Sequence, residues 1–357
     1  MGCFKLDEEK TVSTADKKDN KKMKKGTKVL LIIVCILVGI AIAMAAAVFI
    51  LTAVGRNAMT DESGMDLSAY AGEFESLDSG VIRYKGKLYQ YNDELSCVLL
   101  MGIDSYQKQE LSSAVNNNQS DVNVLAILDP KNEKLTLLSV SRDTMCTIDV
   151  LDADGTEAGT AQAQLALAYS YGDGAERSCE LTAKAVSRLF YGLKVPAYAS
   201  IYMNGISDLV DLVGGVNVTP SESFNGFNAG QQYELKGGLT EKYIRFREHT
   251  VDGNNQRMER QNQVLLSLVY KGLHNAKSNP SSILDLYSGV KDNTSTNVNT
   301  AMMVYLAQQA VKLDFDGQIH KIPGHSEMGE QNHAVFVVDE DAFFEQILDI
   351  FYNEINA

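Results

Sequence analysis

An uncharged apolar run near the N-terminus constrains this chain more than any other feature of its sequence. Residues 29–54, VLLIIVCILVGIAIAMAAAVFILTAV, contain no charged side chain. Because about 20 apolar residues span the core of a bilayer, the run predicts one transmembrane helix. The apolar region of a cleaved signal peptide is only about 7 to 15 residues long, so we expect an uncleaved anchor.

The charge around this run predicts its orientation. Residues 1–28 form a basic tail with nine lysines against five acidic residues, and lysine-rich flanks stay in the cytoplasm. We therefore expect a single-pass protein of the cell membrane with everything after about residue 55 outside the cell. The formal net charge is −14, so the tail's +4 leaves −18 for the exported part. Nucleic-acid binding needs a basic face, and we exclude that partner.

The exported part divides into a spacer and a folded domain. Residues 55–80 are polar and small and predict an extracellular spacer. Short apolar runs with strand composition then alternate with segments of helical periodicity, from residue 81 to 275. Such alternation predicts an α/β fold, a three-layer α-β-α sandwich with a central mixed sheet. Residues 276–357 continue the apolar spacing of packed elements, so we expect them to be integral to the same domain.

The familiar nucleophile motifs are absent from the sequence, which has no GxSxG, no HExxH and no Walker loop. Three cysteines, Cys97, Cys146 and Cys179, fall in the exported part. Three cannot all pair and none forms CxxC, so we expect buried apolar residues, with one disulfide as the open alternative. Carboxylates and arginines remain as the side chains that could carry chemistry.

Four of the nine arginines lie between residues 245 and 260, in YIRFREHTVDGNNQRMERQ. We expect residues 242–248 to form a strand with Arg245 and Arg247 on one face, and residues 257–273 to form a helix with Arg257 and Gln261 on one face. Arg260 lies off that face and could instead pair with an acidic group. Guanidinium groups concentrated in an acidic chain indicate a site for an anion such as phosphate.

Two aspartates and one arginine lie at the ends of apolar strands. Asp104 in LLMGIDS and Asp121 in QSDVNVLAILD would project from the edge of the sheet, although such an aspartate, taken alone, is more often a turn or cap residue. Arg142 in LLSVSRDT directly follows the third run. It could enter the same crevice, where open α/β sheets bind ligands, or pair with Asp143.

Five segments in this order behind one transmembrane helix resemble the LytR-CpsA-Psr family of bacterial cell-wall glycopolymer ligases. They are LLMGIDS, SDVNVLAILDP, LLSVSRDT, GISDLVDLVGGVNV, and YIRFRE followed by RMERQ. The resemblance covers roughly residues 95–275. It implies a membrane-anchored extracellular phosphotransferase that moves a teichoic acid, capsule or similar glycopolymer from a polyprenyl-pyrophosphate carrier to peptidoglycan.

The resemblance also implies roles for individual residues. Asp104 and Asp121 would hold Mg²⁺ near the pyrophosphate. Its oxygens would be bound, for catalysis, by Arg142, Arg245, Arg247, Arg257 and Gln261, with Arg260 as a further substrate-binding candidate. The sequence departs from the family where Gln119 replaces the usual Arg, Ser141 the usual Pro and Asn254 the usual Asp. Two other functions stay open: a non-catalytic sensor that holds lipid pyrophosphate, and a phosphatase that uses water as the acceptor.

Overall fold

The computed structural model describes residues 25–60, 64–77, 80–105, 116, 118–152, 154–246, 253–279, 281–329 and 333–356. Helix α1 (Lys25–Met59) contains the apolar run, and over Ile40–Met59 it is long and apolar enough to cross a membrane. The predicted anchor is thus a helix of suitable length and composition. The chain divides after Phe49, and Ile50–Ala357 form one compact unit, called the domain below.

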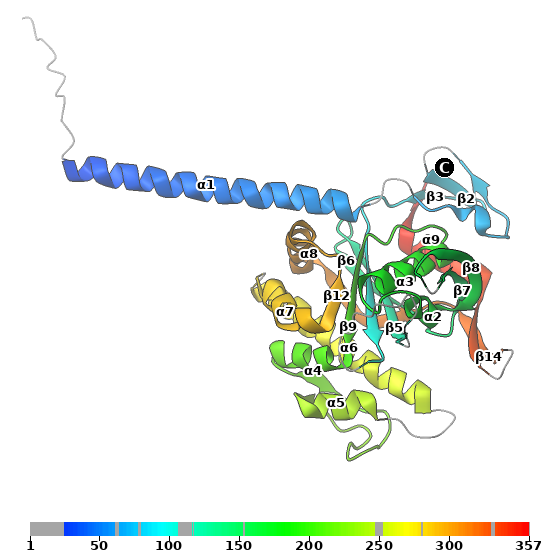
Figure 1. The fold of residues 1–357 in the computed structure, drawn as a ribbon. Helices are drawn as coiled ribbons and strands as arrows, with labels where there is room; N and C mark the ends of the chain where they lie inside the picture. The colour runs from blue at the N-terminus through cyan, green and yellow to red at the C-terminus, as the bar shows by residue number, and fades with distance from the viewer. Residues whose placement is uncertain are drawn as a thin grey trace, which may run out of the picture. The chain divides into compact units, whose positions relative to one another are not determined.

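A six-stranded mixed sheet forms the centre of the domain (Figure 1). Its strands in spatial order are β12 (Thr294–Thr296), β9 (Ala197–Tyr202), β4 (Ser96–Ile103), β5 (Ser120–Asp129), β6 (Lys134–Val140) and β13 (Asp314–Lys321). β9 pairs with β4 in parallel, whereas β5 runs antiparallel to both β4 and β6. The predicted mixed sheet is therefore confirmed.

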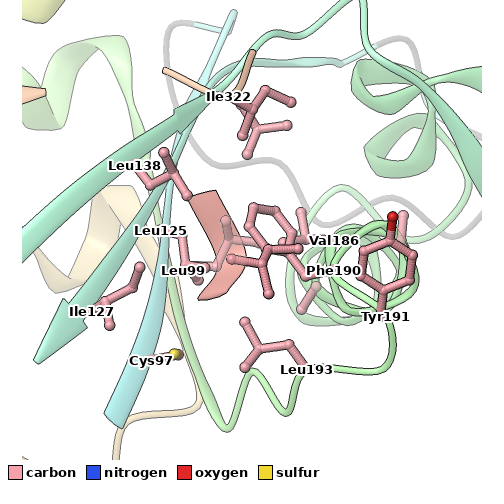
Figure 2. Close-up of a cluster of buried hydrophobic side chains, with 14 of the residues drawn as sticks. Cys97, Leu99, Leu125, Ile127, Leu138, Val186, Phe190, Tyr191, Leu193 and Ile322 are labelled. Atoms are coloured by element: carbon pink, nitrogen blue, oxygen red, sulfur yellow. The ribbon is translucent and has the colours of Figure 1, made fainter. Parts of the chain in front are cut away.

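One face of the sheet packs against α2 (Leu165–Ser170), α3 (Glu176–Leu189) and α9 (Glu340–Phe351). Figure 2 shows this core, in which Leu99, Leu125 and Leu138 of the central strands lie with Val186 and Phe190 of the α3 region. Each of these five side chains is fully buried. Strands with an uninterrupted apolar sequence are expected when both faces of a sheet are covered.

The opposite face packs against α6 (Gly253–Ser278) and α8 (Thr300–Lys312). Val124 and Leu137 point to this side and join a second core with Met302 and Tyr305 of α8. A third, smaller core lies among α4 (Met203–Leu212), α5 (Gly238–Arg245) and α6, and α7 (Ser282–Val290) contacts α4. Helices on both faces confirm the predicted three-layer sandwich.

Smaller sheets surround this framework. The hairpin expected after residue 80 is present, with β2 (Val81–Tyr84) antiparallel to β3 (Lys87–Tyr91), and this sheet also contains β1 (Glu75–Ser76) and β16 (Tyr352–Ile355). The others are pairs of strands: β7 (Met145–Leu151) with β8 (Glu157–Gln164), β10 (Val216–Val218) with β11 (Tyr233–Leu235), and β14 (Gly324–Met328) with β15 (Ala334–Val338). Short 3₁₀ helices cover Leu67–Ala69 and Lys291–Asn293.

The segment that we expected to be a spacer packs on the domain instead. Met59, Leu67 and Tyr70 are buried, and the Tyr70 ring stacks on Phe344 with 3.9 Å between ring centroids. A few apolar residues are enough to hold this polar segment against the core. The average composition of its 26 residues does not reveal them. At the other end of the chain, residues 276–357 supply β13 to the central sheet and α9 to the core.

The three cysteines of the domain are buried, as the sequence predicted. No disulfide joins any two of Cys97, Cys146 and Cys179. Burial raises the pKa of the Cys146 thiol to about 12, so this thiol stays protonated and unreactive.

Candidate functional site

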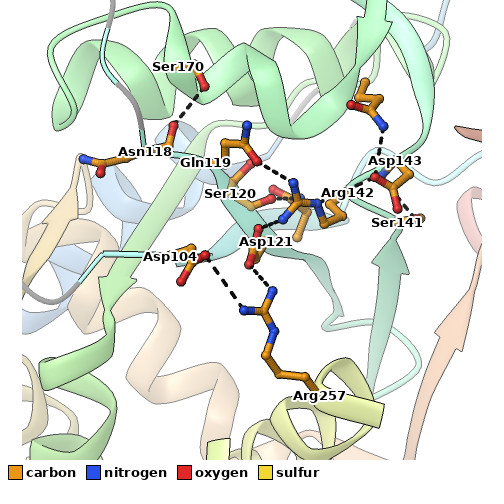
Figure 3. Close-up of polar contacts among 12 residues, drawn as sticks. Asp104, Asn118, Gln119, Ser120, Asp121, Ser141, Arg142, Asp143, Ser170 and Arg257 are labelled. Atoms are coloured by element: carbon orange, nitrogen blue, oxygen red, sulfur yellow. Dashed lines mark hydrogen bonds and ion pairs between the residues drawn. The ribbon is translucent and has the colours of Figure 1, made fainter. Parts of the chain in front are cut away.

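The register of two antiparallel strand pairs brings the candidate residues together (Figure 3). Asn123 of β5 pairs with Val140 of β6, and continuing that register places Asp121 opposite Arg142. On the other side, the Asp104 amide donates to the Gln119 carbonyl at 3.2 Å, so Asp104, which follows β4, lies beside the start of β5. Residues that are 38 positions apart in the sequence therefore meet at one edge of the sheet.

Asp121 is the centre of this group. Its side chain is only 2% exposed, and one oxygen accepts from Nη1 of Arg142 while the other accepts from Nη2 of Arg257 at 2.7 Å. Burial raises the pKa of Asp121, and the nearby charges of Arg142 and Arg257 act in the opposite direction. Two guanidinium groups thus compensate one buried carboxylate.

Arg257 lies between the two aspartates. It extends from the first turns of α6, where its Nη1 is 3.9 Å from Oδ2 of Asp104. Its side chain is 13% exposed, whereas that of Asp104 is 50% exposed. Asp104 and Asp121 are therefore separated by the width of one guanidinium group, with Asp104 on the solvent side.

The Arg142 guanidinium lies against three acceptor side chains. Besides Asp121, it donates through Nη2 to the side-chain oxygen of Gln119, and its Nε is 3.7 Å from Oδ1 of Asp143. Asp143 also accepts from Gln164 at 3.1 Å, and burial raises the pKa of the Asp143 carboxyl. Of the two alternatives that we left open for Arg142, the structure shows the pairing with Asp143, while its entry into the crevice stays a prediction.

The expected strand over residues 242–248 is wrong in its described part. Residues up to Arg245 form α5, in which the buried side chains are Thr240, Tyr243 and Ile244. That spacing of three and four suits a helix packed on its neighbours α4 and α6. Arg245 pairs with Glu241 at 3.5 Å and lines a small pocket of about 100 Å³ together with Asp104 and Arg257. Arg247 lies outside the described residues.

Arg260 is directed away from the aspartates. Its side chain is 4% exposed, its guanidinium lies 4.3 Å from the centroid of the Phe224 ring, and Nη1 is 3.2 Å from Glu222. Nη2 donates to the carbonyl oxygen of Phe246. The structure therefore gives Arg260 the acidic surface partner that the sequence offered as an alternative to substrate binding.

An apolar cavity of about 360 Å³ begins beside this group. Its walls come from β4, β9, α4, α6, α7 and α8, and Asp121 and Gln261 are among its lining residues. Gln261 is buried, and neither atom of its amide has a hydrogen-bond partner among the described residues. A buried amide without partners is costly, so Gln261 is suited to bind a polar group of a molecule that enters the cavity.

Sequence reasoning missed the supports of this site. Gln119 was considered only as the loss of a positive charge, but its amide oxygen fixes Arg142. The backbone just before it is anchored by Asn116, whose buried amide donates to the carbonyls of Tyr169 and Gly172. The run NNNQ gives no signal for this role. Of the other departures, Ser141 accepts from the Asp143 amide at 3.3 Å, and the side chain of Asn254 lies outside the described residues.

One protein-family profile matches most of the chain. The profile of the LytR_cpsA_psr family matches residues 65–348. The chain is 30% identical over 220 residues to the polyisoprenyl-teichoic acid–peptidoglycan teichoic acid transferase TagU of Enterococcus faecalis, covering 60% of this chain and 65% of that protein. The chain thus spans less than two thirds of the length of that relative.

Two solved structures share the fold. The crystal structure of Bacillus subtilis TagV has a TM-score of 0.52 at 23% identity and covers 71% of this chain and 94% of that one. The structure of TagT bound to LIIa-WTA also has a TM-score of 0.52, at 21% identity, and covers 72% and 89% of the two chains. At these identities the likeness concerns the fold alone.

Proposed function

Because the chain belongs to the LytR_cpsA_psr family, we propose that it is a membrane-anchored extracellular phosphotransferase. In this proposal it moves a glycopolymer, such as a teichoic acid or capsule polymer, from a polyprenyl-pyrophosphate carrier to peptidoglycan. The observation that carries the proposal is that Asp121, which lines one end of an apolar cavity, contacts both Arg142 and Arg257, with Asp104 beside Arg257. The names of relatives support it, since TagU is named for a polyisoprenyl-linked donor and a peptidoglycan acceptor and TagT has been solved with LIIa-WTA.

The two parts of the site suit the two parts of such a donor. An apolar cavity can take the start of a lipid chain, and the guanidinium groups at its end can bind phosphate oxygens with charge-assisted hydrogen bonds. Gln261 lies at the junction, where its free amide can meet the phosphate that joins the lipid. A soluble anionic substrate would need the guanidinium groups for binding but would not need an apolar cavity beside them.

The reaction requires an acceptor hydroxyl to attack the phosphorus attached to the glycan. A phosphorus–oxygen bond forms to the acceptor, the bond to the polyprenyl phosphate breaks, and the hydroxyl proton passes to solvent. Negative charge grows on the departing phosphate, and stabilising it is the main task of a phosphoryl-transfer site. We assign this task to Arg245 and Arg257, which line the same small pocket.

The charges of the described site favour an added cation. Four carboxylates, those of Asp104, Asp121, Asp143 and Glu241, lie against three guanidinium groups, those of Arg142, Arg245 and Arg257. A pyrophosphate adds about two to three negative charges. The arginines alone therefore do not neutralise the complex.

Asp104 and Asp121 fit a Mg²⁺ ion. Magnesium commonly takes one or two protein carboxylates and completes its shell with water and substrate phosphates. The two aspartates share Arg257 as a neighbour, which keeps their carboxylates close. Within the described residues no group of three His, Cys, Asp or Glu side chains could hold a metal, so the substrate would have to supply ligands. The ion, when bound, would neutralise phosphate charge.

The test uses the full chain in lipid vesicles with a labelled polyprenyl-pyrophosphate-linked saccharide, peptidoglycan fragments and Mg²⁺, with and without a chelator. Mass spectrometry should find the saccharide joined to peptidoglycan through phosphate, only when the metal is present. Asp104→Ala should lose this product, whereas Asp314→Ala, whose carboxylate is 94% exposed, should keep it. Binding without product would favour a sensor, and saccharide phosphate released into solution would favour a phosphatase.

A further inference from the structure

Four large apolar side chains are exposed together on the domain, and we name them the α4–α7 patch. Leu212 ends α4, Leu239 lies in the first turn of α5, and Leu284 and Tyr287 lie on α7, with each residue more than a third exposed. Isolated exposed leucines are ordinary, but soluble proteins seldom group them without a partner. Figure 1 shows the three helices on the same side of the central sheet.

Contacts between the helices make these residues one surface. Gly289 of α7 lies so close to α4 that a Cβ there would come within 2.4 Å of Cδ1 of Leu212. At the same end of α4, Oδ1 of Asp211 accepts from the amide of Gly237 at 2.8 Å, which holds the start of α5 beside it. These contacts bring together the parts of three helices that carry the patch residues.

Helix α7 belongs to both the patch and the wall of the apolar cavity. Ile283 and Val290 line the cavity, Leu284 is exposed, and Tyr287 both lines the cavity and is exposed. A helix that is apolar toward both sides is unusual for a protein surface and typical of an apolar environment. Whatever covers the patch therefore lies next to the part of the cavity wall that Tyr287 forms.

The domain also holds the end of its own candidate membrane span. Met59 is buried in the domain core, Gln308 of α8 donates to the Thr52 hydroxyl at 2.8 Å, and Gly55 leaves no room for a Cβ beside the Ala301 carbonyl. α8 in turn contacts α7. The last residues of the candidate span, from Thr52 to Met59, therefore pack as part of the domain.

We propose that the α4–α7 patch rests in the interface of the bilayer that holds the anchor, so that α7 lies between the lipid and the cavity. Tyr287 has the amphipathic ring that favours membrane interfaces. Helices α4 and α7 carry acidic Asp208, Asp211 and Asp285, and basic Lys291 follows α7. Apolar insertion, and not attraction to anionic headgroups, therefore provides the contact. Passage of a donor lipid under α7 would follow, and this consequence alone rests on the proposed function.

The chain contains no tryptophan, so one introduced tryptophan reports its own surroundings. The experiment places Tyr287→Trp and, separately, Ile355→Trp in the full chain in vesicles of phosphatidylcholine with brominated or ordinary acyl chains. Ile355 in β16 is a matched control, because both side chains are 37% exposed. We expect brominated lipid to quench the fluorescence at position 287 and not at 355, and we expect added anionic lipid not to increase this quenching.

Two results would overturn the contact. Equal quenching at positions 287 and 355 would show that the patch has no special access to lipid. A blue-shifted emission at 287 without quenching by brominated lipid would show that protein, such as a second copy of the chain, covers the patch.

A second variant tests the consequence for the donor. Leu284→Asp should slow transfer from a long-chain donor embedded in vesicles and leave transfer from a short-chain, water-soluble donor unchanged, with thermal unfolding as the check on folding. Equal slowing with both donors would contradict entry at α7. If the wild-type chain transfers neither donor, the proposed function fails, and the tryptophan measurement still decides whether the patch contacts the bilayer.

Discussion

Replacing Arg260 by alanine should destabilise the domain, because its side chain is built into the protein interior. The guanidinium lies over the Phe224 ring at 4.3 Å, bonds to Glu222 at 3.2 Å and donates to the carbonyl of Phe246. A desolvated cation–π contact contributes about 2 kcal/mol. The bond to partly exposed Glu222 adds about 0.5 kcal/mol, and the carbonyl bond about 1 kcal/mol.

We therefore expect Arg260→Ala to lower the free energy of unfolding by about 3.5 kcal/mol. Each kcal/mol corresponds to about 2 to 4 °C in the unfolding temperature for domains of about 150 to 250 residues, and to less for a larger domain, so the midpoint should fall by up to about 14 °C. Thermal unfolding of the full chain in detergent, followed by circular dichroism, measures the change.

Arg245→Ala is the matched control. Arg245 pairs with Glu241 across one turn of a surface helix, an interaction that contributes about 0.3 to 0.5 kcal/mol. We expect a nearly unchanged midpoint and loss of glycopolymer transfer, since Arg245 lines the pocket with Asp104 and Arg257. An unchanged midpoint with lost transfer in Arg260→Ala would refute the reasoning and return Arg260 to substrate binding. Wild-type turnover in Arg245→Ala would remove that residue from the site.

Three further predictions concern other parts of the domain. Burial raises the pKa of Asp149, but bonds from Arg188 and Lys184 outweigh it and hold the pKa below its usual value. The ionised form thus stabilises the fold above about pH 4, so Asp149→Asn should cost about 2 kcal/mol in urea unfolding at neutral pH, and this difference should vanish as acid protonates the wild-type group. Cys146 should resist iodoacetamide in the folded chain and react after unfolding, as mass spectrometry can show, because burial raises its pKa to about 12. Ala199→Phe should narrow the apolar cavity and reduce transfer from long-chain donors while sparing short-chain donors.

The central sheet could be predicted because its strands coincide with continuous apolar runs in the sequence. β4 and β5 are buried on both faces, so their sequences have the composition of buried strands. The positions of Asp104, Asp121 and Arg142 next to those runs then follow from strand ends alone. Their contact with one another depends on the register in which β5 pairs with β4 and β6, and no local sequence pattern indicates that register.

The arginine-rich segment was harder to predict because distant residues decide its structure. Aromatic and β-branched residues around Tyr243 and Ile244 favour a strand locally, but packing against α4 and α6 makes this segment a helix. Arg260 is turned away from the phosphate-type site by Phe224 and Glu222, which lie 36 and 38 residues earlier. Nothing in the intervening sequence indicates that pairing.

The most direct measurement follows the phosphorus itself. A polyprenyl-pyrophosphate-linked saccharide carries radioactive phosphorus only in the phosphate next to the sugar, and it is incubated with the full chain, Mg²⁺ and peptidoglycan. We predict that the label moves to peptidoglycan together with the saccharide, and that Asp104→Ala and Arg245→Ala prevent this. Label that remains with the lipid while the saccharide moves would contradict attack at that phosphorus, and with it the role we assign to the aspartates and arginines at the end of the cavity.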